Sequence, residues 1–234
     1  MTGNLAALFA AMLAFVGGHF LLSSPPVRGA LVALIGETAF AAMYSLIMLA
    51  CLAWVIAAYR VAPPHVLWDA GFRSNLVPLI AMPFAMILAV VGLGSRSPTL
   101  MGGGALFRHG AVEVRGVFTI TRHPFLCGAA LWAIAHLVAN GDAASVLLFG
   151  GMAILAIAGM FAIDHKRSLK LGDAWASYVG HSSRFPFAAA VAGRTRVDWA
   201  GIGWLRPALG VVLYVVLLFA HDWLFGVPAG LILN

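Results

Sequence analysis

Long apolar stretches without charged residues alternate with polar segments along this chain. A transmembrane helix needs about 20 consecutive apolar residues, and a charge inside it costs a few kcal/mol. These rules predict six membrane-spanning helices, at Leu5–Leu22, Thr38–Tyr59, Asn75–Gly94, Phe125–Ala139, Ala144–Ile163 and Leu205–Phe225. The fourth is short and the sixth contains His221 and Asp222, so five spans with one re-entrant segment are the alternative. Both readings predict an all-α, polytopic membrane helical bundle.

The composition supports a membrane protein. Hydrophobic residues make up 62% of the 234 residues and charged residues only 9%, whereas soluble domains carry about 25% charged residues. We expect one integral membrane domain over residues 1–234, with a cytoplasmic connector over residues 164–206. No Lys or Arg precedes the first apolar run, which is longer than the core of a secretory signal, so we expect it to be retained in a bacterial inner membrane.

The basic residues predict an orientation. If the connectors after the first, third and fifth spans share one side of the membrane, that side holds 12 of the 14 Lys and Arg residues, and only Arg60 and Arg73 lie on the other. Basic residues in short loops favour the cytoplasmic side, so both termini should be periplasmic. The net charge of +6 then indicates contact with membrane lipids that have anionic head groups, and no nucleic-acid partner is expected.

Histidines near or inside the spans fall into two tiers by depth. His19, His123 and His165 lie near the predicted cytoplasmic ends of spans, and His136 and His221 lie much farther outward. The thirteen residues from His123 to His136 correspond to about 20 Å along a helix. These two histidines therefore cannot share one metal ion.

The outer pair, His136 and His221, has two interpretations. Neutral imidazoles on facing helices of a bundle can hold a haem from both sides. Alternatively, each ring bonds a carbonyl group or a neighbour such as Asn140 or Asp222. The two cysteines, Cys51 and Cys127, both lie within spans, so we expect small buried apolar side chains and no disulfide.

The triplet Arg122-His123-Pro124 opens the fourth predicted span. Proline is well placed in the first turn of a helix, which leaves Arg122 and His123 at the membrane surface. They could anchor lipid head groups or recognise an anionic substrate or cofactor. The acidic residues at span ends, as possible partners for these cations, are Glu37, Asp142 and Asp164.

Three stretches resemble the NnrU family of bacterial membrane proteins. They are "FVGGHFLLSSPPVRGALVALIGE" (Phe15–Glu37), "MYSLIMLACLAWVIAAYRVAP" (Met43–Pro63) and "TRHPFLCGAALWAIAHLVANGD" (Thr121–Asp142). The family is associated with denitrification gene clusters, and its plant relatives include 15-cis-zeta-carotene isomerase, which uses haem b. The resemblance implies a haem-binding membrane protein, with polyene isomerase chemistry or a role in denitrification.

The resemblance also implies site residues. The haem ligands of the isomerase branch match His19 and His136, and the cysteine three residues before the second histidine is replaced by Ala133. Because the depth tiers separate His19 from His136, we keep His221 as an alternative partner of His136. The expected metal ligands are thus His136, His19 and His221, and the substrate is a polyene or another lipid-like molecule.

A more distant resemblance connects "RHPFLCG" (Arg122–Gly128) and the stretch from Asp164 to Phe187 to membrane methyltransferases of isoprenylcysteine or phospholipids. It implies S-adenosylmethionine near Arg122 and His123. Leu126 replaces the tyrosine of that motif, and Asp164 replaces its glutamate. A third hypothesis is a non-catalytic accessory protein that assists the assembly of a respiratory or denitrification complex.

Overall fold

The computed structural model describes residues 4–69, 71–100, 102–109, 112–227 and 229. Over these residues the regular structure is helical, apart from one β-bridge between Val66 and Asp142. The prediction of an all-α membrane bundle is therefore confirmed.

Six helical stretches correspond to the predicted spans. They are α1 (Leu5–Ser23), α3 (Glu37–Arg60), α4 (Leu76–Gly94), α5 (Pro124–Ala139), the continuous stretch of α6 (Ala143–Ser145), the π-helical η4 (Val146–Gly150) and α7 (Gly151–Leu171), and α11 (Leu205–Phe225). All of these except α5 are long and apolar enough to cross a membrane. Among the described residues five helices thus meet the length and hydropathy of a membrane span, and α5 is an additional, shorter apolar helix.

Helix α5 is the short fourth span of the sequence prediction. Its 16 residues rise about 24 Å, which is less than the ~30 Å hydrocarbon thickness. It nevertheless runs beside α7 in the opposite direction, because His123 bonds Asp164 near one end and His136 packs on Phe149 near the other. Within the described residues α5 is one continuous helix.

The helix that carries the fifth predicted span is longer than the span. The span was expected to end at Ile163, and α7 continues to Leu171. The polar residues after Ile163 therefore project from a rigid helix. Gly172, with a φ of +50°, ends it, because this backbone conformation strongly favours glycine.

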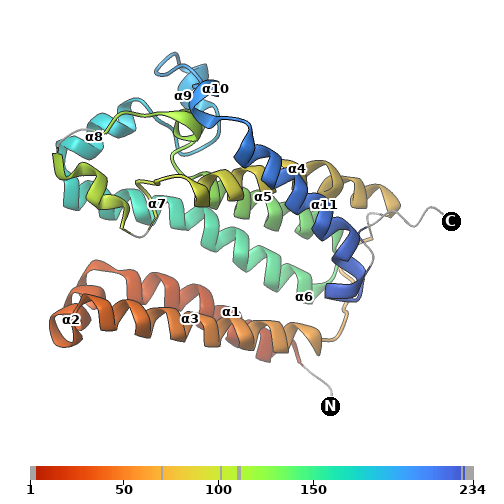
Figure 1. The fold of residues 1–234 in the computed structure, drawn as a ribbon. Helices are drawn as coiled ribbons and strands as arrows, with labels where there is room; N and C mark the ends of the chain where they lie inside the picture. The colour runs from red at the N-terminus through yellow and green to blue at the C-terminus, as the bar shows by residue number, and fades with distance from the viewer. Residues whose placement is uncertain (1–3, 70, 101, 110–111, 228, 230–234) are drawn as a thin grey trace.

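The shorter helices gather at one end of the bundle (Figure 1). They are α2 (Pro25–Ile35), α8 (Asp173–Gly180), α9 (Ala188–Val191) and α10 (Trp199–Ile202), with the 3₁₀ helices η2 (Gly103–His109) and η3 (Gly116–Thr119) nearby; η1 (Phe72–Asn75) precedes α4. We call this end the connector end. Helix α1 begins and α11 ends at the opposite end (Figure 1), which we call the terminal end.

Helix α7 lies between the α1–α3 pair and the group of α4, α5 and α11 (Figure 1). Glycines allow α4 and α5 to pack closely: a Cβ on Gly92 would lie 2.6 Å from Phe125 N, and one on Gly128 would lie 2.6 Å from Ala85 O. On the other side of α7, Met12 of α1 packs against Gly151. This arrangement brings the start of α5 next to the middle of α7, where the polar site forms.

Candidate functional site

A buried ionic cluster joins the start of α5 to α7 at the connector end. The Asp164 carboxylate accepts hydrogen bonds from Arg122 Nε and Nη2, at 3.0 and 2.6 Å, and from His123 Nε2 at 2.8 Å. Arg184 Nε donates to the same carboxylate at 2.8 Å. Side chains of Arg122, His123 and Asp164 are at least 92% buried, so the carboxylate is held by charge-assisted bonds in a region from which water is largely excluded.

The backbone around Arg122 is held in place by neighbouring segments. Arg122 N donates to Ser183 O at 2.8 Å, and the Thr99 hydroxyl donates to Arg122 O at 3.0 Å. Thr121 is fully buried and its hydroxyl donates to Arg184 O at 2.7 Å. Two segments far apart in the sequence, one at Thr99 and one at Ser183 and Arg184, therefore position the arginine, and the cluster is preorganised.

The cluster carries net positive charge. Two guanidinium groups, from Arg122 and Arg184, face the single carboxylate of Asp164. Burial lowers the pKa of His123 below its usual 6.5, although the bond to Asp164 acts in the opposite direction. His123 is therefore a neutral donor through Nε2 near pH 7, and its Nδ1 is buried without a partner in the described part of the chain.

A cavity of about 390 Å³ adjoins this cluster. Its lining is Arg122, Phe161, Asp164, His165, Ser168, Gly172, Trp175, Ala176, Val179 and Arg184. Arg184 also stacks on Phe161, with 3.9 Å between the guanidinium carbon and the ring centroid. The cavity thus combines cations with aromatic walls, and this combination suits a ligand that has an anionic group and an apolar part.

His136 lies far from this cluster, near the terminal end of α5. Its Nδ1 donates to Trp132 O at 2.9 Å, and its ring packs on Phe149 with 5.1 Å between centroids. His221, the other member of the predicted outer pair, lies near the end of α11, and its Nδ1 donates to Val227 O at 2.7 Å.

His19 lies on α1 and faces a different set of side chains. Its Nδ1 donates to Phe15 O at 2.7 Å, and its ring lies edge-on to Tyr44 at 5.8 Å. Seven residues separate it from Met12, so both lie on the face of α1 that packs on α7. Met12 contacts Gly151, so these two residues lie at the same height in the bundle. His19 lies seven residues beyond Met12 toward the connector end, and Phe149 lies two residues before Gly151 toward the terminal end. At 1.5 Å per residue, His19 and the His136–Phe149 pair therefore differ in height by about 13 Å.

The three predicted haem ligands share one chemical feature. In each, Nδ1 bonds a backbone carbonyl oxygen, and a carbonyl can only accept, so Nδ1 must carry the proton. The lone pair is then on Nε2, the usual state of a metal-binding histidine. The donor chemistry of His19, His136 and His221 therefore fits a haem iron. The bond from each ring to a carbonyl, which was the alternative interpretation of these histidines, is compatible with metal binding, because it uses Nδ1 and leaves Nε2 for the metal.

The other sequence-predicted partners lie elsewhere. Glu37 pairs with Arg28, and Asp142 caps α6 by accepting from Ser145 N at 3.0 Å. Of the three acidic candidates, only Asp164 meets Arg122 and His123 in the described residues. Both cysteines are free thiols; Cys127 is buried as expected, whereas Cys51 is only partly buried. The described residues contain no group of three or more potential metal-ligating side chains.

Arg184 was not singled out by sequence reasoning. It lies in the long connector, 20 residues after Asp164, where nothing distinguishes it from the other basic residues of that segment. The contact depends on the fold of the connector back onto α7. The buried Thr121 and Tyr178 were missed for the same reason.

Comparison with known families assigns the chain. The family model described as "NnrU protein" matches residues 7–229. The chain belongs to the NnrU family. This NnrU protein is also 29% identical over 82 residues to the chloroplastic 15-cis-zeta-carotene isomerase of Zea mays. That match covers 35% of this chain and 22% of the relative, and no solved structure matches the chain.

Proposed function

We propose that this NnrU protein is a membrane enzyme that isomerises a double bond in a polyene or another long apolar substrate, with a b-type haem as cofactor. Family membership and the match to a carotene isomerase support the reaction class. The observation that carries the proposal is His136, which lies within an apolar helix with its Nε2 lone pair available. Ionisable residues at such depth usually serve a function.

His136 would be one of the residues that hold the haem iron. The second would be His221, because its Nδ1 is also bonded to a carbonyl oxygen and its Nε2 lone pair is free, whereas the height difference of about 13 Å keeps His19 from the iron that His136 would hold. When bound, a b-type haem supplies an iron centre that can share electron density with a conjugated double bond and so lower the barrier to rotation. The hydrogen bond from His136 Nδ1 to Trp132 O orients the imidazole for this purpose.

The residues around His136 would exclude water. Trp132 and Phe149 pack against the imidazole, with ring centroids at 5.5 and 5.1 Å. A cis–trans isomerisation changes only the configuration of one bond, so substrate and product have the same atoms and electrons. No acid, base or nucleophile of the chain is consumed, and an apolar site with one metal ligand is sufficient.

A spectroscopic experiment tests the cofactor. The full-length protein, purified in detergent from haem-replete cells, should show a Soret band and sharp α and β bands after dithionite reduction. His136→Ala should abolish these bands. His181→Ala is the matched control, because exposed His181 in the connector makes the same type of bond, from Nδ1 to Ser177 O at 3.1 Å. A colourless wild-type protein would refute the haem assignment.

The second ligand follows from two further variants. If His19 completes the pair, His19→Ala should shift the Soret band and His221→Ala should leave it unchanged; the opposite result assigns His221. Isomerisation is measured separately, by chromatography of a cis-polyene incubated with the reduced protein in liposomes. A haem-loaded protein that leaves the isomer ratio unchanged would retain the cofactor assignment and refute the reaction.

A second candidate is a methyltransferase that uses S-adenosylmethionine. It is favoured by one observation, the assembly of Arg122, His123 and Asp164 beside a 390 Å³ cavity. Against it, the Asp164 carboxylate is already bonded to three side chains. Calorimetric titration with S-adenosylmethionine separates the two candidates. If the wild type binds it and Ser168→Trp, which fills the cavity, does not, the methyltransferase is supported. If the wild type does not bind it, the methyltransferase is eliminated.

We further propose a bacterial inner membrane with the connector end in the cytoplasm. Support comes from the basic residues of the connector end, such as Arg28, Lys166 and Arg194. A cysteine introduced at exposed Arg196 should react with a membrane-impermeant maleimide only after the cells are opened. Reaction in intact spheroplasts would reverse the orientation.

A further inference from the structure

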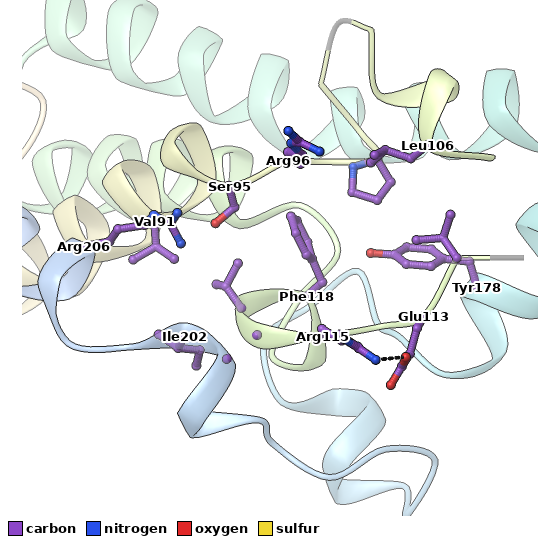
Figure 2. Close-up of a pocket in the computed structure, with 15 residues that line it drawn as sticks. Val91, Ser95, Arg96, Leu106, Glu113, Arg115, Phe118, Tyr178, Ile202 and Arg206 are labelled. Atoms are coloured by element: carbon purple, nitrogen blue, oxygen red, sulfur yellow. Dashed lines mark hydrogen bonds and ion pairs between the residues drawn. The ribbon is translucent and has the colours of Figure 1, made fainter. Parts of the chain in front are cut away.

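A second cavity lies where α4 and α11 meet the segments around η3 and α10. Its volume is about 280 Å³, and it shares no lining residue with the cavity beside Asp164. Figure 2 shows side chains from these elements converging on it. The cavity lies at the connector end, where α4 ends and α11 begins, and so at the level expected for lipid head groups.

The cavity is lined by three arginines and one carboxylate. These are Arg96, Arg115, Arg206 and Glu113, and Arg115 forms an exposed ion pair with Glu113. Over the residues that the structure describes, Arg96 and Arg206 have neither a hydrogen bond nor an ion pair through their side chains. A Cβ on Gly94 would be 3.3 Å from Arg206 Nε, so the glycine leaves room for this guanidinium beside the end of α4.

A buried hydroxyl group points into the same space. Tyr178 is 1% exposed, and its hydroxyl has no hydrogen-bond partner in the described residues. Figure 2 shows this hydroxyl directed toward the cavity, on the side of Phe118. Trp175 stacks on the ring at 5.4 Å and fixes its direction. Because burial raises the pKa of Tyr178, the hydroxyl keeps its proton and can donate to an acceptor.

We propose that this cavity binds a phosphate group, held by Arg96, Arg206 and the Tyr178 hydroxyl. A phosphate has several acceptor oxygens and matches the fork geometry of guanidinium groups. It would also satisfy the hydroxyl, since buried polar groups are almost always hydrogen-bonded. The volume is just below the ~300–1,000 Å³ of sites for drug-sized ligands, so it admits a head group but not a whole lipid.

The phosphate can come from a phospholipid or from free phosphate. The rest of the wall includes the apolar residues Val91, Val117 and Ile202. Such a wall can contact the glycerol backbone of a lipid, and it also leaves room for a free phosphate ion. The proposal does not depend on haem or on isomerase activity, since none of its residues is near His136.

The test uses the full-length protein in neutral detergent. Native mass spectrometry first measures retention of phosphatidylglycerol against diacylglycerol with the same acyl chains, and calorimetry then measures binding of inorganic phosphate. The variants are Arg96→Gln, Arg206→Gln and Tyr178→Phe. Controls are Arg196→Gln, an exposed arginine of the same connector, and Tyr214→Phe, whose hydroxyl donates to Leu79 O at 3.2 Å. Size-exclusion profiles and circular dichroism confirm that each variant is folded.

Retention of phosphatidylglycerol but not of diacylglycerol, without competition by inorganic phosphate, identifies a lipid head group. Saturable binding of inorganic phosphate that displaces the lipid identifies a free-phosphate site. In either case each arginine variant should weaken binding by at least tenfold and Tyr178→Phe by about tenfold, with both controls unchanged. If neither ligand binds, or if the folded cavity variants bind as the wild type does, the proposal is wrong.

Discussion

Arg122 and Asp164, 42 residues apart in the chain, form a two-pronged ion pair, with Arg122 Nη2 at 2.6 Å and Nε at 3.1 Å from Asp164 Oδ2. The pair connects Arg122, two residues before the start of α5, to the side of α7, and Arg184 from the long connector binds the same carboxylate. One buried charge therefore ties together two helices and a connector.

Removing that charge should be strongly destabilising. Asp164→Asn leaves Arg122 buried without its counter-ion, so we expect a loss of about 3–5 kcal/mol in unfolding free energy. The measurement is equilibrium unfolding in mixed micelles, followed by circular dichroism. Glu113→Gln removes the carboxylate of an exposed ion pair and should change the stability by less than about 1 kcal/mol. Equal losses in the two variants would contradict a special role for Asp164.

The contact between α4 and α5 should depend on Gly128. In Gly128→Ala the new methyl group would lie 2.6 Å from Ala85 O, which forces the helices apart and should cost about 1–3 kcal/mol. Gly159→Ala is the matched control on α7, because its Cβ would lie 3.8 Å from the nearest atom, in Leu126. Thermal unfolding of the two variants checks this, and a Gly128→Ala protein as stable as the control would show that the helices can separate without cost.

His123 should make the protein less stable in mild acid. Its folded-state pKa lies below the unfolded value of 6.5, with burial as the main cause, so its contribution is present above about pH 6.5 and is lost as the pH falls below it. His123→Gln, which keeps an N–H donor, should flatten the pH dependence of the melting temperature between pH 7 and 5. The exposed control His181→Gln should follow the wild type; an unchanged slope in His123→Gln would assign the acid sensitivity to other groups.

Asp198 should act at lower pH. Hydrogen bonds from Gly116 N and Gly201 N lower the pKa of this carboxyl group, so its stabilisation is present above about pH 4 and is lost as the pH falls through the folded value. Asp198→Asn should therefore be less stable than the wild type at neutral pH, and the two melting temperatures should converge as the pH falls below the folded-state pKa of Asp198. A constant difference would indicate packing rather than charge.

Hydropathy was sufficient to predict the helices to within one or two residues at most ends. Leu205–Phe225 was predicted with both ends correct, α1 is longer than predicted by one residue at its end, and α3 is longer by one residue at each end. The exception was the end of α7, because charged residues after Ile163 signal the edge of the hydrocarbon and not the end of a helix. A helix can continue into the head-group region without any penalty to its backbone hydrogen bonds.

The polar site could be predicted only in part. Arg122 and His123 were placed at a span end with Asp164 as one of three possible acidic partners, and the structure selects Asp164 over Glu37 and Asp142. Depth along a helix follows from the number of residues and the rise per residue, so it can be counted in the sequence. The direction in which a side chain points depends on how each helix is rotated against its neighbours.

The membrane class and the depth of each histidine therefore follow from local properties, because apolar transfer free energies add along a segment and helical rise is constant. The bond from Arg184 to Asp164 and the cavity around Tyr178 do not. They depend on the path of a long connector and on close packing at glycines such as Gly92 and Gly94. Contacts of this kind form only when the whole bundle is assembled, because they join residues far apart in the sequence whose relative positions no single segment determines.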